Sequence, residues 1–334
     1  MPRLHVALTP LAAVGVALCV SGGMRTLAGQ PAPQTPSAPA APRVLPDPVR
    51  PDPAVPDLVV PDYIAPPVQR LAARTLRAYD VPEADQGVAA DARFFYAVDN
   101  TVLAKYVIAS GQLVDRWIGP RNGLIRHLNS CLADAGRLWC ANSNYSLTPM
   151  GSSIEVFDAA SLDHVDTHSL GLRDEGSLTW TDRVRDGWIA GFTHYDGNGG
   201  AGFKNHTFSN VVAFDAAWRR TGGWLFPSTV VQRLAPGGAS GGAIGPDGWL
   251  YLLGHDRPEL YVVAQPSMGP TLIHLATIDL EAEGQAFSWA QDGTRAIFTI
   301  DRRKHLVRRI EVPPVTTTDR DARPFRRTRP RAAR

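Results

Sequence analysis

The chain has 334 residues, of which 44% are hydrophobic and 20% charged, and its formal net charge at pH 7 is +2. This composition is that of a globular protein, and the 28 Pro and 30 Gly favour turns and linkers over long helices. Basic residues are concentrated at the two ends, so the rest of the chain carries about −5, which argues against nucleic acid as a partner.

Residues 1–28 have the pattern of a secretory signal peptide. Arg3 precedes an apolar run over residues 6–20, and small residues follow as a cleavage site. A membrane anchor is the alternative, but it needs about 20 apolar residues, and Arg25 ends the run too early. Because Cys19 does not follow a small residue, a lipid-modified N-terminus is disfavoured. We expect a soluble exported protein, secreted or periplasmic, without a transmembrane span after cleavage.

Two low-complexity segments flank the central part of the chain. Residues 29–70 are rich in Pro and Ala and poor in aromatic residues, which predicts a disordered tether. Residues 316–334 contain seven Arg and two Asp, with Phe325 as the single aromatic residue. Without interleaved aromatic residues this stretch is typical of a basic disordered tail, and a nucleic-acid-binding tail is the alternative. The folded domain is expected at residues 71–315.

The central part has an all-β pattern with an internal repeat. Short runs rich in Val, Ile, Tyr, Phe and Trp alternate with Gly, Asp, Asn and Pro, and no apolar stripe has a helical period. Related segments begin units at residues 85–91, 127–134, 175–180, 240–247 and 283–289. In each unit a turn and a second apolar run follow. Four runs per unit predict a β-propeller with five four-stranded blades, and six blades are the alternative if the long third unit hides one.

The last unit contains only three runs, so one strand has to come from elsewhere. Residues 75–80 form an apolar run just before the first unit. Pairing this N-terminal strand with the last unit closes the ring and removes exposed sheet edges.

Removal of the signal peptide leaves two cysteines, Cys131 and Cys140. A tight turn at Ala135 and Gly136 places them opposite each other on paired strands. An exported protein can form a disulfide there; the alternative is two small apolar residues facing each other.

Starts such as Gln86-Gly-Val-Ala and Glu283-Gly-Gln-Ala resemble those of secreted propellers of the gluconolactonase-like and NHL-type groups. The chain resembles the five-bladed glutaminyl cyclases more loosely. The resemblance covers about 240 residues and implies the propeller fold. The metal ligands and catalytic residues of those families have no one-to-one match here, so it implies no residue roles.

Polar residues end the first two runs of each unit, and the propeller topology brings these ends to one mouth of the central channel. Asp, Asn and Ser at such ends also cap backbone groups, whereas Glu and His are not favoured in turns. We therefore predict a site there. The candidate catalytic residues are Asp85, Glu175, His194 and Glu283, and the candidate ligand-binding residues are Gln86, His127, Asn129, Asp196, His255 and Gln285.

Three kinds of chemistry fit this set. Glu175, Glu283 and Asp85 are suited to acid-base catalysis of the type used in glycoside hydrolysis. His127, His194 and His255 are suited to one divalent metal ion, Ca or Zn, that activates water or polarises a carbonyl. The third possibility is a polar binding pocket without catalysis.

Two motif matches lack the structural context they need. Ser240 lies in a Gly-x-Ser-x-Gly pattern, but a predicted strand and not a helix follows it. Residues 197–202 match a dinucleotide-binding fingerprint, but no helix follows and no βαβ unit surrounds it. We interpret residues 196–206 as a loop at the channel mouth.

The sequence therefore predicts an exported, monomeric propeller that acts on a small polar or carbohydrate-like molecule, as a hydrolase, lactonase or cyclotransferase. The alternative is a non-catalytic propeller that binds a ligand or serves as an envelope scaffold, because a fold does not determine a function.

Overall fold

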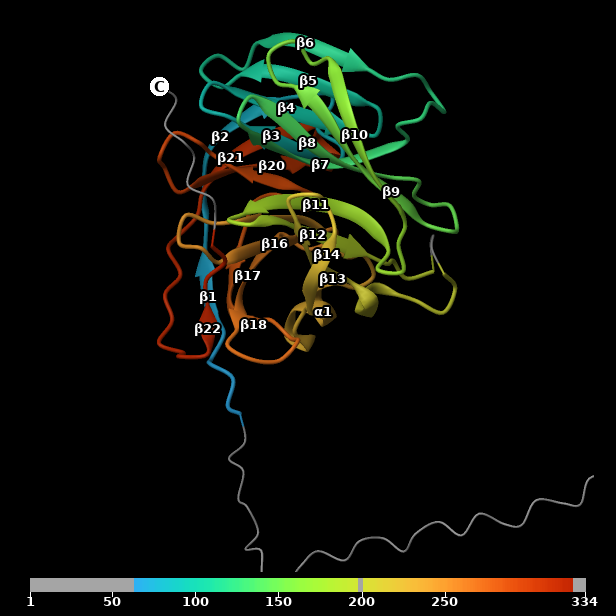
Figure 1. Cartoon of the computed structure of the whole chain (residues 1–334). Coiled ribbons are helices and arrows are strands. Elements are labelled where there is room, and N and C mark those ends of the chain that lie inside the picture. Colours follow the sequence, from blue (N-terminus) through green and yellow to red (C-terminus); the bar gives the residue numbers. More distant parts are fainter. Residues whose placement is uncertain (1–62, 198–200, 327–334) are drawn as a thin grey trace, which may run out of the picture. The chain divides into compact units, whose positions relative to one another are not determined.

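The computed structural model describes residues 63–197 and 201–326. Within them the chain forms five blades around a central axis, each built on four antiparallel strands (Figure 1). The first strand of each blade is innermost and contacts the innermost strands of neighbouring blades. The predicted five-bladed all-β propeller is confirmed, and the six-bladed alternative is wrong.

The strands of each blade follow one another in sequence. Blade 1 consists of β3 (Gly87–Ala90), β4 (Phe94–Asp99), β5 (Val102–Val107) and β6 (Leu113–Ile118). Blade 2 consists of β7 (His127–Asp134), β8 (Arg137–Ser143), β9 (Gly151–Asp158) and β10 (His164–Leu172). Blade 3 consists of β11 (Ser177–Val184), β12 (Gly187–Thr193), β13 (Asn210–Asp215) and β14 (Arg220–Leu225).

Blade 4 consists of β15 (Ala239–Ile244), β16 (Leu250–Gly254), β17 (Glu259–Pro266) and β18 (Ile273–Asp279). Blade 5 contains β19 (Phe287–Trp289), β20 (Ala296–Asp301) and β21 (Leu306–Glu311). The helical segments of the described residues are short: η1 (His206–Phe208), α1 (Ser228–Leu234) and η2 (Arg302–Lys304). None of them is long and apolar enough to cross a bilayer.

The N-terminal strands close the ring. β2 (Arg74–Asp80) pairs antiparallel with β21 and completes blade 5, as predicted. The shorter β1 (Gln69–Ala72) was not predicted as a strand; it runs parallel to β18 at the outer edge of blade 4. The two strands together link blades 4 and 5, and β1 begins two residues inside the segment predicted as a tether.

The C-terminal segment differs from the predicted disordered tail over residues 316–326. β22 (Ala322–Arg323) pairs with the end of β17. Phe325 is only 2% exposed, and its ring lies 5.6 Å from that of Trp224. The free energy gained by burying this apolar ring offsets the conformational entropy lost when the charged segment becomes ordered. Residues 327–334 of the predicted tail lie outside the described residues, as do the predicted signal peptide and most of the predicted tether.

The inner strands approach one another so closely that small residues are required on them. A Cβ on Gly87 would lie 2.8 Å from the Cβ of Ala286 in blade 5 and 2.8 Å from the carbonyl oxygen of Asn129 in blade 2. Real Cβ atoms are essentially never found at such distances, so close packing of the inner strands explains why a Gly occurs at this start of the repeat.

The predicted disulfide between Cys131 and Cys140 is present. The two residues are register partners on β7 and β8. Ala135 and Gly136 both have positive φ, 50° and 75°, as the two central residues of the tight turn require.

Candidate functional site

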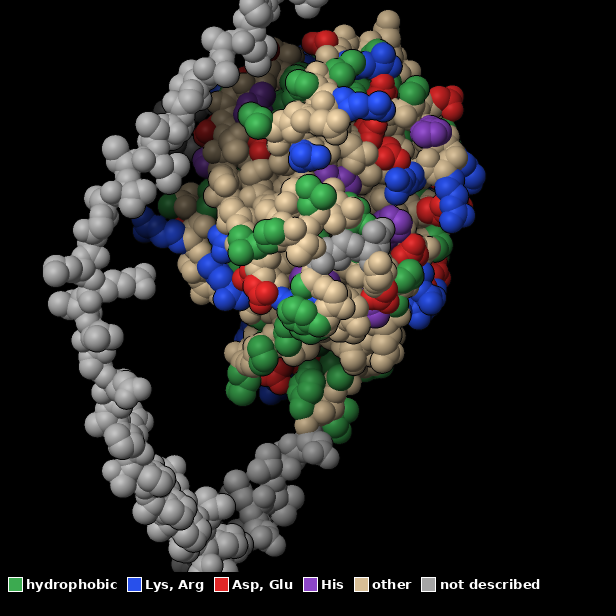
Figure 2. Space-filling view, turned by 90° about the vertical axis from the view of Figure 1, so that its right-hand side faces the viewer, with side chains coloured by type: hydrophobic (Ala, Val, Ile, Leu, Met, Phe, Trp, Pro, Cys, Tyr) green, Lys and Arg blue, Asp and Glu red, His purple; other side chains and the backbone are tan. Residues whose placement is uncertain are grey.

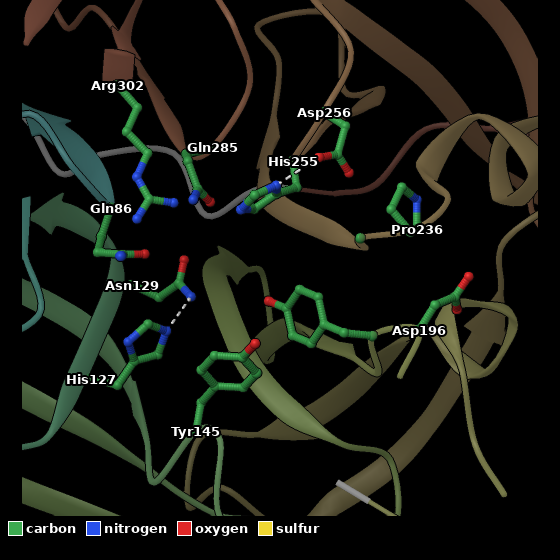
Figure 3. A pocket seen from close by; sticks show the side chains of 12 residues that line it. Gln86, His127, Asn129, Tyr145, Asp196, Pro236, His255, Asp256, Gln285 and Arg302 are labelled. Carbon is green, nitrogen blue, oxygen red and sulfur yellow. Dashed lines mark hydrogen bonds and ion pairs between the residues drawn. The ribbon is translucent and has the colours of Figure 1, made fainter. Parts of the chain in front are cut away.

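A cavity of about 350 Å³ lies at the mouth of the central channel where the innermost strands begin. Residues from all five blades contribute to its wall (Figure 3). The wall is formed by Gln86, His127, Asn129, Tyr145, Tyr195, Asp196, Pro236, Gly237, His255, Asp256, Gln285 and Arg302. Figure 2 shows this face of the molecule, with His side chains visible across its middle. We call this cavity the channel pocket.

Three buried amide side chains form one side of the channel pocket. Gln86 and Gln285 precede β3 and β19, and Asn129 lies on β7, so each comes from an innermost strand of a different blade. Their exposed fractions are 5%, 3% and 2%. The Oδ1 atom of Asn129 has no hydrogen-bond partner among the described residues, and Figure 3 shows it directed into the cavity. A buried acceptor without a partner is costly, so this atom favours a donor supplied by a ligand or water.

His127 is held as a neutral imidazole beside these amides. Its Nδ1 lies 2.5 Å from Asn100 Oδ1, and Asn129 Nδ2 lies 3.4 Å from its Nε2. Burial lowers the pKa of His127 to about 4, against a smaller opposing effect of the Asp85 charge. At neutral pH the ring therefore adds no charge to the pocket.

Aromatic rings form a second side. The ring of Tyr145 lies 5.2 Å from that of His127 and 5.0 Å from that of Tyr195, measured between centroids. Burial raises the pKa of both tyrosines, so their hydroxyls stay protonated. They are partly buried and present ring surface as well as hydroxyls to the cavity.

The charged groups of the wall are paired within the protein. Arg302 Nε donates to Asp85 Oδ1 at 2.7 Å, and the Nδ1 of His255 lies 2.9 Å from Asp256 Oδ1. His206 lies outside the wall; its backbone N–H and its ring bond Asp196 and together lower the pKa of that carboxyl. The cation on the wall, Arg302, thus already has a carboxylate partner in Asp85, and this pairing disfavours the binding of an anionic ligand.

A pair of carboxyl groups lies behind the wall. Asp99, at the end of β4, is close to Asp85; burial, together with the charge and hydrogen bond of Asp85, raises the pKa of Asp99. Neither residue lines the cavity. Asp85 accepts hydrogen bonds from Arg302 Nε at 2.7 Å and from Gln86 Nε2 at 3.0 Å, so it supports these two lining residues and does not itself face a ligand.

The structure brings together every residue predicted to bind a ligand. Gln86, His127, Asn129, Asp196, His255 and Gln285 all line the channel pocket. Their role in binding stays a prediction, but their convergence follows from the repeat, because equivalent strand ends meet at one mouth.

The structure does not bring the predicted catalytic residues into the cavity. Glu175 Oε1 forms an ion pair with Arg220 Nε at 3.2 Å, and Glu283 Oε1 forms one with Arg303 Nη1 at 3.0 Å. His194 is buried outside the cavity, with its Nε2 3.3 Å from a backbone carbonyl oxygen. Asp85 reaches the pocket only through the lining residues Arg302 and Gln86. Acid-base chemistry by the predicted carboxylates is therefore not supported, because a catalytic acid must contact its substrate.

The predicted metal ligands do not form a cluster either. His127 and His255 line the channel pocket, whereas His194 does not. In the part of the chain that the structure describes, no group of three or more His, Cys, Asp or Glu side chains is arranged to hold a metal ion.

Sequence reasoning missed Tyr145, Tyr195, Pro236 and Gly237. For Tyr195 a signal was available. Side chains alternate between opposite sides along an extended chain, and Tyr195 directly follows His194. His194 lies against Asp174 and Phe208, so its neighbour Tyr195 points to the channel. Tyr145 is two residues past the end of β8, and Tyr195 is two residues past the end of β12, so the two tyrosines occupy equivalent positions in blades 2 and 3.

The two discounted motifs lack the required context in the structure as well. Ser240 is fully buried on β15, and the chain continues into another strand, β16, without a helix. Residues 197 and 201–202 lie in the connection that leads from β12 to η1, whereas residues 198–200 lie outside the described residues.

No protein-family model matches this chain, and a search of curated proteins found no match. Solved structures with a similar fold include a chain of a mitotic checkpoint complex, which is 9% identical, with a TM-score of 0.40, over 78% of this chain and 98% of that one. The U3-55K structure is 10% identical, with a TM-score of 0.41, over 72% of this chain and 98% of that one. The RRP9 WD40 repeats are 10% identical, with a TM-score of 0.36, over 75% of this chain and 100% of that one. The resemblance to gluconolactonase-like, NHL-type and glutaminyl cyclase propellers stays a prediction.

Proposed function

We propose that this propeller binds a small, uncharged, sugar-like molecule in the channel pocket. The observation that carries this proposal is the pair of facing surfaces: buried amides of three blades on one side and two tyrosine rings on the other. A cavity of about 350 Å³ is within the range of small-molecule sites.

The chemistry of the two surfaces matches a polyhydroxylated ring. Amide side chains offer both donors and acceptors, which suits hydroxyl groups that also do both. The unpartnered Oδ1 of Asn129 gains a hydrogen bond from such a hydroxyl. Tyrosine rings cover the apolar C–H face of a sugar while their hydroxyls contact its rim.

The charges on the wall select against an anion. Arg302 is already paired with Asp85, and two further carboxylates, Asp196 and Asp256, line the same cavity. A carboxylate or phosphate on the ligand would meet these groups without a free cation to balance them. We expect neutral sugars to bind more tightly than their uronic acids.

Calorimetric titration with glucose, galactose and N-acetylglucosamine, beside glucuronate, tests this proposal. Gln285→Ala removes one amide and should weaken binding of a neutral sugar by about 3- to 10-fold. Tyr145→Ala removes a ring surface and should weaken it by roughly tenfold or more. Gln112→Ala, on an exposed turn, is the matched control and should leave binding unchanged. Absence of binding by every neutral sugar, or equal binding by all variants, would contradict the proposal.

Hydrolysis of the bound molecule is a second candidate, favoured by His255. Its Nδ1 is held by Asp256 at 2.9 Å, and Figure 3 shows the other ring nitrogen directed into the cavity. A His oriented in this way is suited to act as a general base towards water. His255→Gln should abolish turnover of p-nitrophenyl glycosides or a sugar lactone while changing affinity only a few-fold. If the wild-type protein turns over none of these compounds, the hydrolysis proposal is wrong and the proposal of sugar binding stands alone.

We also propose that the protein acts outside the cytoplasm. The predicted signal peptide lies in a part of the chain that the structure does not describe. The disulfide between Cys131 and Cys140 supports an oxidising compartment. N-terminal sequencing of the protein from fractionated cells should find a mature chain that begins near residue 29. An uncleaved chain in the cytoplasm would contradict this.

A further inference from the structure

A second cavity lies between blades 1 and 2, and the channel-pocket proposal does not use it. Its volume is about 600 Å³, larger than that of the channel pocket. We call it the inter-blade groove. One side is apolar and is formed by Trp117 of β6 and by Pro120, Leu124 and Ile125 of the following connection. The other side comes from β8, β9 and β10 of blade 2. Blades 1 and 2 are neighbours in the ring, and Figure 1 shows them in the upper part of the view.

The polar floor of this groove is satisfied by its own contacts. Glu155 is 4% exposed, and its carboxylate accepts hydrogen bonds from Ser153 Oγ at 2.5 Å and Thr167 Oγ1 at 2.7 Å. Asn142 Nδ2 adds a bond of 3.4 Å, and the Nε2 of His164 lies 2.8 Å away. A ligand would therefore gain little binding free energy from hydrogen bonds to the Glu155 carboxylate. The surface of the groove that a ligand can still cover is the apolar side with Trp117 and Leu124.

One strongly exposed aliphatic side chain, Leu124, lines the groove, and two more belong to residues next to its lining in the sequence. Leu124 is 101% exposed, Leu172 is 69% exposed and Ile118 is 68% exposed. Leu172 follows the lining residue Gly171 and Ile118 follows the lining residue Trp117, but side chains alternate along a strand, so Leu124 is the one of the three that lies in the groove itself. Scattered exposed aliphatic residues are ordinary, but Leu124 lies in a concave groove beside Trp117 and Ile125, and such an apolar patch marks an interaction site.

The same connection carries two cations without partners. The side chains of Arg121 and Arg126 are exposed, and neither guanidinium group has a hydrogen bond or an ion pair within the described ranges 63–197 and 201–326; the backbone N–H of Arg126 donates to Asn142 Oδ1 at 3.3 Å. By contrast, Arg116 on β6 is paired with Glu83 at 2.5 Å. The connection over residues 119–126 thus presents positive charge next to Leu124, which complements an acidic partner.

We propose that the inter-blade groove binds an extended segment of another protein, in which an apolar side chain is flanked by Asp or Glu. The apolar side chain enters the groove against Trp117 and Leu124, and the flanking carboxylates meet Arg121 and Arg126. A concave site of about 600 Å³ suits an inserted side chain better than a flat bilayer surface. The proposal is independent of what the channel pocket binds.

Selection from a library of random 12-residue peptides on phage, with the immobilised full chain as bait, tests this assignment. Enriched peptides should share a Leu, Ile, Phe or Trp next to an acidic residue. Fluorescein-labelled copies are then titrated by anisotropy. Leu124→Ser should weaken binding roughly 10- to 100-fold, because a buried Leu side chain contributes that much. The double variant Arg121→Ser with Arg126→Ser should weaken binding several-fold at 50 mM NaCl and less at 300 mM, because salt screens the charges.

Matched controls come from exposed residues away from the groove. Met268 is 84% exposed, and Met268→Ser should bind the peptides like the wild type. Arg320→Ser is the corresponding control for charge. No peptide enrichment, or equal binding of enriched peptides by Leu124→Ser, would overturn the proposal. Phosphatidylglycerol vesicles that bind through Arg121 and Arg126, without any enriched peptide, would also overturn it in favour of a membrane surface.

Discussion

Acidification should destabilise this propeller through two buried imidazoles. His127 lies in the wall of the channel pocket, and His274 lies on β18, 7% exposed, with its Nδ1 3.0 Å from Thr229 Oγ1. Burial lowers the pKa of each to about 4 from the ordinary value of 6.5. The folded protein therefore resists protonation of both rings, whereas the unfolded chain accepts protons below pH 6.5.

The sign and size of the effect follow from this difference. Between pH 6.5 and 4 the unfolded state binds more protons than the folded state, so the free energy of unfolding falls as the pH falls. One unit of pKa difference corresponds to about 1.4 kcal/mol, and each imidazole should therefore cost about 3 kcal/mol by pH 4. At pH 7 neither ring contributes to this effect.

Urea denaturation followed by Trp fluorescence at pH 7, 6, 5 and 4 measures the free energy of unfolding directly. His127→Gln keeps a polar side chain but removes the proton-binding site, so its stability loss between pH 7 and 4 should be smaller by about 3 kcal/mol. Changes from carboxyl groups such as Glu259, whose pKa is lowered to about 2, affect both proteins and cancel in the comparison. His305→Asn, at an exposed position, should follow the wild type. Parallel curves for His127→Gln and wild type would refute the reasoning.

Three further changes test the fold. Replacing Cys131 and Cys140 by Ser should lower the free energy of unfolding by roughly 2.5 kcal/mol, as urea denaturation with and without reductant can show, since the closed loop is short. Gly191→Ala should lower the free energy of unfolding by about 3 kcal/mol or more, because the new Cβ would lie 2.0 Å from the buried indole nitrogen of Trp180. Gly202→Ala is the control: open space surrounds this position, so the melting temperature should not change. Deletion of residues 1–80 removes β1 and β2, leaves blade 5 without its outer strand, and should produce aggregation in size-exclusion chromatography.

The sequence alone predicted the architecture because its signals are local. Short alternating runs between turn residues predict strands, and the recurrence of one start, such as Gln86-Gly-Val-Ala, predicts blades. The tight turn at Ala135 and Gly136 was enough to place the two cysteines opposite each other. The same topology brought the six predicted ligand-binding residues to one mouth, because equivalent strand ends of a propeller must converge there.

Tertiary structure decided which side chains at that mouth face the cavity. His194 and Glu175 are strand-end residues like His127, but His194 is buried against Asp174 and Phe208, and Glu175 forms an ion pair with Arg220. A one-residue difference in an extended chain reverses the direction of a side chain, which is why Tyr195 lines the channel pocket and His194 does not. The β1 pairing and the burial of Phe325 also depend on partners far away in the sequence, and no local pattern encodes those contacts.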